Sequence, residues 1–136
     1  MDRGEVSQNL LKGHGDSVRK ILEFRHGNFI TCSDDGNIAI WQGDGRISSP
    51  LTIFKAHMSK INDIALIDNK NLLLSASDDH LIGIKNMSTE GNIIKEEPLK
   101  DVCEVKIIRG FENNAAFAFS AGSDQNIKIW NIKKRL

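Results

Sequence analysis

The chain has 136 residues, of which 40% are hydrophobic and 26% are charged, so it can bury a core and is not composed like a disordered segment. Lys and Arg number 18, as do Asp and Glu, and a net charge of zero argues against nucleic-acid or membrane partners bound through bulk electrostatics. Cys32 and Cys103 lack metal-binding spacing and favour a reducing, intracellular compartment, cytoplasmic or nuclear. No stretch resembles a signal peptide or a transmembrane helix.

Short stretches typical of β-strands follow one another along the chain. Apolar runs alternate with polar turns, and after each turn apolar residues occur at every second position. In chain order, these stretches lie at or begin at residues 5–11, Val18, Phe29, Ile38, 51–54, Ile61, 72–74, Ile82, 93–94, Val105, 117–119 and Ile127. No amphipathic helical period of useful length is present, so the chain is predicted to be all-β.

An internal repeat organises these stretches. The segments that align without gaps are residues 31–41, 75–85 and 120–130. Each reads as strand, tight turn and strand, and Asp35, Asp79 and Asp124 fall at the same place in the turn. The period is therefore about 44 residues, with room for four short strands in each unit.

Residue pairs at fixed points complete the pattern. Gly13-His14 and Ala56-His57 precede the first strand of two units, and Trp41-Gln42 and Trp130-Asn131 end the third strand of two units. The pattern resembles the WD-repeat family, whose units carry Gly-His at the start and Trp-Asp at the end. The resemblance covers nearly the whole chain and implies a partial β-propeller of three four-stranded antiparallel blades.

The resemblance divides the single domain, residues 1–136, into blades. Blade 1 is expected at about 12–55, blade 2 at about 56–99 and blade 3 at about 100–136, with residues 5–11 as an outer strand. Propellers have four to eight blades, so three blades form an open arc that cannot close by itself. Two interpretations stay open: a homodimer that completes a six-bladed ring, or a truncated fragment of a larger WD-repeat protein without independent function, which the ends of the chain favour.

The family also implies a buried polar network in each blade, in which His contacts the turn Asp and a hydroxyl that in turn contacts Trp. The matching residues are His14, Thr31, Asp35 and Trp41 in blade 1, His57, Ser75 and Asp79 in blade 2, and Ser120, Asp124 and Trp130 in blade 3. Lys85 replaces the Trp of blade 2, and Asp101 stands where blade 3 should have His. Paired buried donors and acceptors fix one geometry, so these residues are predicted to be structural.

An enzymatic interpretation of the same residues is disfavoured. The sequence has no Gly-x-Ser-x-Gly elbow, no cofactor fingerprint and no metal cluster, so catalytic residues, cofactors and metals are all expected to be none. Parallel copies of the same residue types, with His in two of the three units, suit a repeated structural element better than one active site. An enzyme or small-molecule-binding propeller remains the weaker alternative.

The family's partners bind at one rim of the propeller, beside the first strand and before the turn Asp. The corresponding positions are Ser17, Arg19, Asp34, Lys60, Asn62, Asp78, Glu104, Lys106 and Ser123. Their mixed charges are typical of a surface for other proteins or peptides, and few exposed aromatic residues are available to stack on bases. The chain is therefore predicted to be a non-catalytic protein-interaction scaffold, with no nucleic-acid or membrane partner.

Overall fold

Short strands pair with their neighbours in sequence to form three antiparallel sheets. The computed structural model describes residues 8–67, 71–87, 93–96, 99–101, 103–111 and 114–132. The first sheet has the order β1-β2-β3-β4, with β1 Val18–Glu23, β2 Phe29–Ser33, β3 Asn37–Trp41 and β4 Thr52–Lys55. A single 3-10 turn, η1 Arg25–Gly27, links β1 to β2.

The second and third sheets repeat this meander. The second contains β5 Ile61–Ile67, β6 Leu72–Ser77, β7 Leu81–Met87 and β8 Ile93–Glu96, with β9 Leu99–Lys100 also paired with β7. The third contains β10 Val105–Phe111, β11 Asn114–Gly122 and β12 Ile127–Asn131. Three antiparallel sheets of this kind confirm the predicted all-β partial propeller, and each sheet is called a blade below.

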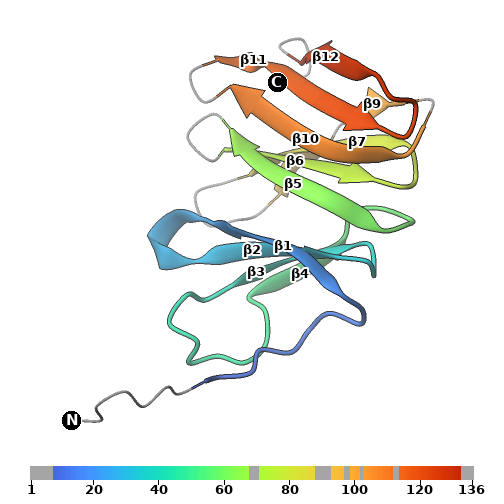
Figure 1. Ribbon diagram of the computed structural model, residues 1–136. Coiled ribbons are helices and arrows are strands. Elements are labelled where there is room, and N and C mark those ends of the chain that lie inside the picture. The colour runs from blue at the N-terminus through green and yellow to red at the C-terminus, as the bar shows by residue number, and fades with distance from the viewer. Residues whose placement is uncertain are drawn as a thin grey trace, which may run out of the picture.

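The blades stack face to face, with β1–β4 at one end, the sheet containing β5–β8 in the middle and β10–β12 at the other end (Figure 1). The core lies in the two joints between them. One cluster joins Ile30, Ile38 and Ile40 of blade 1 to Ile61 and Ile64 of blade 2. A second cluster joins blade 2 to Val105, Ile108 and Ala118 of blade 3. Burial of these aliphatic side chains holds neighbouring blades together.

A β-bulge interrupts the first strand of every blade at the same place. The register shifts between Val18 and Lys20, between Ile61 and Asp63, and between Val105 and Ile107. The extra residue in the bulge is Arg19 in blade 1, Asn62 in blade 2 and Lys106 in blade 3. A bulge re-aims the side chain of the inserted residue, and these three residues are among the predicted rim positions.

The turn between the second and third strands needs a left-handed backbone after its Asp. Gly36 takes this conformation in blade 1 with φ 80°, and a Cβ there would lie 2.4 Å from the carbonyl oxygen of His57. Blades 2 and 3 place His80 and Gln125 at the same position with φ 71° and 67°. Blade 1 alone has the residue that adopts this conformation without steric cost.

The N-terminal segment differs from the outer strand expected at residues 5–11. Residues 5–7 lie outside the described part, and residues 8–11 carry no strand. The segment instead runs past blade 1, where the Lys12 N–H donates to the Ser48 carbonyl oxygen at 2.8 Å. A strand requires a neighbouring edge along which successive backbone groups pair, and residues 8–11 form no such ladder.

Candidate functional site

Blade 1 brings His14, Thr31, Asp35 and Trp41 together. Trp41 Nε1 donates to Thr31 Oγ1 at 2.8 Å, and His14 Nε2 lies 2.6 Å from the same oxygen. On its other side, His14 Nδ1 lies 3.1 Å from Asp35 Oδ2. An ionised carboxylate can only accept, so His14 Nδ1 donates to Asp35, and the Thr31 hydroxyl bridges His14 Nε2 and Trp41 Nε1.

Asp35 also organises the backbone around this network. Its carboxylate accepts from the N–H groups of Gly15 and Asn37, both at 2.8 Å. Burial acts to raise the pKa of Asp35, but these backbone bonds and the His14 contact outweigh it, and the pKa is lowered. The carboxylate therefore joins the segment before β1 to the β2–β3 turn in its ionised form.

Blade 2 repeats the arrangement with His57, Ser75 and Asp79. His57 Nε2 lies 2.7 Å from Ser75 Oγ, and its Nδ1 lies 2.9 Å from Asp79 Oδ2. Lys85 takes the place of the Trp and is buried, with its Nζ 5.6 Å from the centre of the Phe54 ring in blade 1. A cation–π contact thus occupies the blade 1–blade 2 joint beside the network.

The Ser75–His57–Asp79 geometry resembles a hydrolase triad, but no substrate can reach it. Ser75 and His57 are both buried, with exposed fractions of 1% and 3%. Gly83 lies directly across the sheet from Ser75, so close that a Cβ there would be 2.3 Å from the hydroxyl oxygen. A nucleophile must face a space where a reacting atom can sit, and this hydroxyl faces packed backbone.

Burial lowers the pKa of His57, although the nearby Asp79 acts to raise it. In the unfolded chain, His57 takes up a proton near its ordinary pKa of 6.5, whereas in the folded chain it does so only at lower pH. Below pH 6.5 the unfolded state therefore binds more protons than the folded state. We therefore expect the free energy of unfolding to fall as the pH is lowered from 7.5 to 5.5. The effect is measured by urea denaturation followed by circular dichroism.

The control for this pH effect is His26→Gln, because His26 is exposed on η1. His57→Gln should flatten the profile in this window, whereas His26→Gln should keep it. The lowered pKa values of Asp35 and Asp78 affect stability only as the pH falls through about 4, so they do not overlap this window. An unchanged slope in His57→Gln would contradict the assignment.

Blade 3 has a different polar network. Trp130 Nε1 donates to Ser120 Oγ at 2.8 Å, as in blade 1. In place of the missing His, Lys128 Nζ contacts Asp101 and lies 2.7 Å from Asp124 Oδ2. The hydrogen bond from Lys128 is the main cause that lowers the pKa of Asp124 to about 2. Lys128 faces Ser120 across the sheet, at the position of Gly83 in blade 2.

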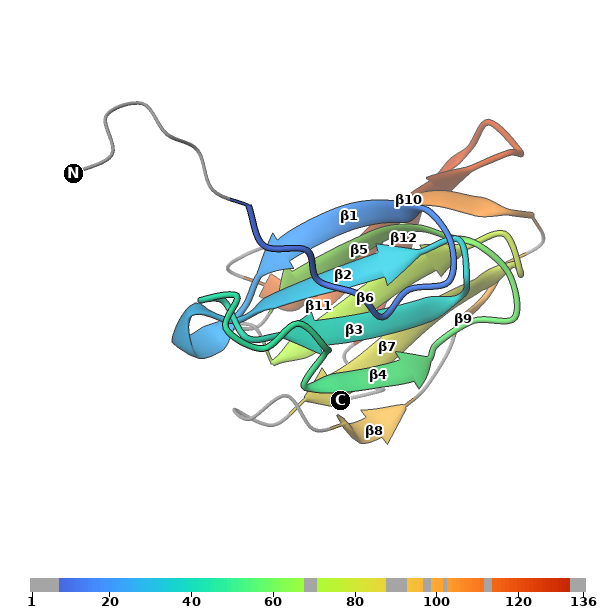
Figure 2. The same ribbon diagram turned by 90° about the horizontal axis from the view of Figure 1, so that it is seen from below.

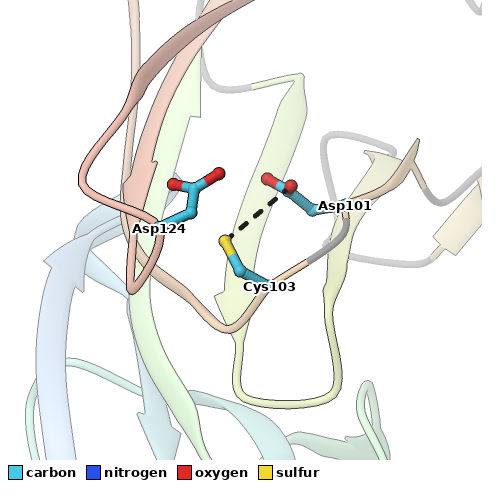
Figure 3. Close-up of side chains that lie close together, drawn as sticks. All are labelled: Asp101, Cys103 and Asp124. Carbon is cyan, nitrogen blue, oxygen red and sulfur yellow. Dashed lines mark hydrogen bonds between the residues drawn. The ribbon is translucent and has the colours of Figure 1, made fainter.

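Asp101, Cys103 and Asp124 lie close together (Figure 3). One potential ligand atom from each falls within 4.8 Å of the others, and Cys103 Sγ lies 3.8 Å from Asp101 Oδ1. The Lys128 ammonium group already contacts both carboxylates and offsets part of their charge. The group is therefore an ion-pair cluster that joins the segment before β10 to β12.

The predicted rim positions gather at one end of the blades. The carbonyl groups of Ser17, Lys60 and Glu104 accept hydrogen bonds from the N–H groups of Asp34, Asp78 and Ser123 respectively, at 2.9, 3.0 and 3.1 Å. Arg19 Nε donates to Asp34 Oδ1 at 2.7 Å, and Asn62 Nδ2 donates to Asp78 Oδ1 at 2.7 Å. Arg19 and Asn62 thus each contact the β-turn of their own blade, whereas Lys106 of blade 3 contacts Asp78 in the turn of blade 2.

Links between blades 2 and 3 make this rim continuous. Lys106 Nζ lies 2.5 Å from Asp78 Oδ1 and 2.9 Å from Glu104 Oε2, and Asn62 Nδ2 also donates to the Val105 carbonyl oxygen at 2.8 Å. The Arg19 hydrogen bond lowers the pKa of Asp34, and Lys106 and Asn62 lower that of Asp78 against the opposing effect of burial. The neighbouring donors thus favour the ionised form of Asp34 and Asp78.

One ionic cluster was not found from the sequence. Asp63, buried on β5, lies 2.6 Å from Lys20 Nζ of blade 1 and also contacts the Arg109 guanidinium group of blade 3. Its carboxylate accepts from the N–H groups of Ile64 and Ile108, both at 3.0 Å. The equivalent positions in blades 1 and 3 are Lys20 and Ile107, so the repeat pattern gave no signal for it.

Comparison with known proteins agrees with this geometry. The family model "WD domain, G-beta repeat" matches residues 5–42 and 48–84, which span the first two blades. The chain belongs to the WD-repeat family. Among the described residues, no helix is long and apolar enough to cross a membrane.

Individual WD-repeat proteins are also similar to parts of this chain. The human WD repeat-containing protein 55 is 32% identical over 98 residues, which are 72% of this chain and 25% of that protein. The ubiquitin homeostasis protein lub1 of Schizosaccharomyces pombe is 32% identical over 81 residues, 60% of this chain and 11% of that protein. The mouse pre-mRNA-processing factor 19 is 25% identical over 126 residues, 92% of this chain and 24% of that protein. The chain thus spans a quarter or less of these relatives.

Proposed function

We propose that this WD-repeat chain is a non-catalytic scaffold that binds a segment of another protein at its rim. The observation that carries the proposal is the exposure of the rim cations above their carboxylates. The side chains of Arg19 and Lys106 are 48% and 42% exposed, whereas that of Asp34 is 5% exposed. Lys60 is exposed between them. A partner approaching the rim therefore meets three exposed cations and one comparably exposed carboxylate, that of Glu104, which is 45% exposed beside Lys106.

This arrangement favours a peptide segment with acidic and polar side chains. Loops and bulges held on a rigid sheet present fixed groups at low entropic cost, as recognition surfaces do. The buried hydroxyl of Ser75 and the sealed networks support the non-catalytic part of the proposal. The intracellular setting stays a prediction from the two free cysteines, Cys32 and Cys103.

The test uses fluorescence polarisation with a labelled twelve-residue peptide of alternating Glu and Ser. We expect it to bind more tightly than the matching Lys–Ser peptide, and Lys60→Glu to weaken it at least about fivefold, a loss near 1 kcal/mol. Arg46→Glu is the matched control, because Arg46 is an exposed cation in the β3–β4 loop, at the opposite ends of the strands. A twelve-nucleotide single strand is the comparison ligand.

Three outcomes would contradict the proposal. Equal binding of the two peptides would remove the charge preference, and an equal loss in Arg46→Glu would remove the rim as its location. Tighter binding of the nucleotide strand would change the partner class.

A second interpretation, that the chain is a part of a larger WD-repeat protein, is supported by the chain's 25% coverage of human WD repeat-containing protein 55. The rim would then serve that larger protein.

A further inference from the structure

Two groups of charged side chains lie along the rim. The first charge group, in blades 1 and 2, consists of Arg19, Asp34 and Lys60, and the second, in blades 2 and 3, consists of Asp78, Glu104 and Lys106. Figures 1 and 2 show β1 and β5 side by side and beginning at the same end of the stack. Each charge group therefore spans a joint that has a blade of this chain on both sides.

The first charge group leaves one cation without a partner. Arg19 donates to both carboxylate oxygens of Asp34, and the charge of Asp16 adds to the effect of Asp34 in raising the pKa of Arg19. Lys60 is exposed and forms no hydrogen bond or ion pair with any residue that the structure describes. Arg19 is thus already paired, and Lys60 is the cation that a ligand can neutralise.

The second charge group has the opposite imbalance. Lys106 Nζ lies 2.5 Å from Asp78 Oδ1 and 2.9 Å from Glu104 Oε2, so two carboxylates share one ammonium group. The side chain of Asp78 is 19% exposed, whereas that of Glu104 is 45% exposed. The unbalanced negative charge is therefore presented to solvent at Glu104.

Lys60 and Glu104 occupy equivalent positions one blade apart. Each directly precedes the first strand of its blade, and their carbonyl oxygens accept equivalent hydrogen bonds, from the N–H groups of Asp78 and Ser123. Sheets that pack face to face lie about 10 Å apart, so the two positions are separated by about that distance. In a polyproline II segment, residues three apart point the same way and lie about 9 Å apart.

We propose that the bound segment carries an acidic side chain that pairs with Lys60 and a basic side chain, three residues away, that pairs with Glu104. This inference rests on the proposed function, because it names the side chains that the rim selects in its partner. Complementary charges at two fixed points determine the register of a bound segment. An acidic side chain over Glu104 would instead meet a like charge, which disfavours segments with acidic residues alone.

The experiment measures fluorescence polarisation with the labelled octapeptide Ser-Ser-Glu-Pro-Pro-Lys-Ser-Ser, whose prolines hold the spacing. We expect it to bind about threefold more tightly than the same peptide with Gln in place of Lys, the effect of one exposed ion pair. Glu104→Gln should abolish this difference. Glu23→Gln is the matched control and should keep it, because Glu23 is an exposed glutamate at the other end of its strand, β1.

Two further comparisons test the acidic position and the spacing. Lys60→Gln should abolish the advantage of the octapeptide over the version with Gln in place of Glu. Removal of one proline should abolish the gain from Lys, because residues two apart in polyproline II point about 120° away from each other. Both protein side chains are solvent-accessible, so circular dichroism should not change in either variant.

The outcomes separate this inference from the proposed function. An equal gain from Lys in Glu104→Gln and in the unmodified chain would overturn the pairing with Glu104. An equal gain with one proline would overturn the spacing. The alternating Glu–Ser peptide is measured in parallel: if it binds while the gain from Lys is absent, only the paired charges are wrong. If neither peptide binds, both the inference and the proposed function are overturned.

Discussion

Replacing Asp63 with alanine is expected to lower the free energy of unfolding by about 3 kcal/mol, the lower end of the cost of breaking a buried ion pair. Asp63 connects all three blades, through Lys20 of blade 1, its own strand and Arg109 of blade 3. Its removal leaves the Ile108 N–H without its carboxylate acceptor inside the stack. The cost stays at the lower end because the Arg109 side chain is 55% exposed and can turn to solvent.

Urea denaturation at a fixed chain concentration measures this loss. Asp16→Ala is the matched control, because Asp16 is an exposed carboxylate before β1 and its loss should change stability by less than about 0.5 kcal/mol. Asp63→Asn should fall between the two, since an amide oxygen can still accept one backbone hydrogen bond. A loss in Asp63→Ala no larger than in Asp16→Ala would show that the blades do not depend on this carboxylate.

Thr31→Val is the second change for which we expect a large effect, about 2–4 kcal/mol of unfolding free energy. Valine matches threonine in shape but removes the oxygen that Trp41 Nε1 and His14 Nε2 share. Trp41 is buried and stacked on Phe29, with ring centres 6.2 Å apart, and its N–H would lose its hydrogen-bond partner. Each unsatisfied buried polar group costs about 1–3 kcal/mol.

Thr52→Val provides the comparison for this variant. Thr52 is a half-buried threonine on the edge strand β4, where a β-branched replacement suits the strand. We expect it to change stability by less than about 0.5 kcal/mol, as surface substitutions do. Tryptophan fluorescence during thermal unfolding follows Trp41 and Trp130 together, and equal midpoints for the two valine variants would refute the shared hydroxyl as a stabilising element.

The sequence was enough to predict most of the strands, the repeat and, through the family resemblance, the polar partners within blades 1 and 2. Strands that follow one another pair with one another, so the alternation of apolar residues and the turn Asp determine the register locally. The resemblance to the WD-repeat family implied that His14, Thr31 and Trp41 meet, and they do so because the segments that carry them belong to one meander. The rim positions also came from that resemblance, and the structure gathers them because a bulge and the adjacent turn lie at the same end of a blade.

The tertiary structure alone decided the contacts that cross between blades or replace a missing residue. Asp63 finds Lys20 and Arg109 more than 40 residues away in each direction, and no local pattern encodes that pairing. Lys128 contacts Asp101 at the place where blade 3 lacks a His, and Lys85 lies over the Phe54 ring between blades 1 and 2. Both contacts form because a long, flexible side chain can reach a charge or ring on a neighbouring segment. The repeat pattern is enough to predict which neighbouring strands pair. Which side chains are buried and which charges pair depends on how the three blades pack on one another.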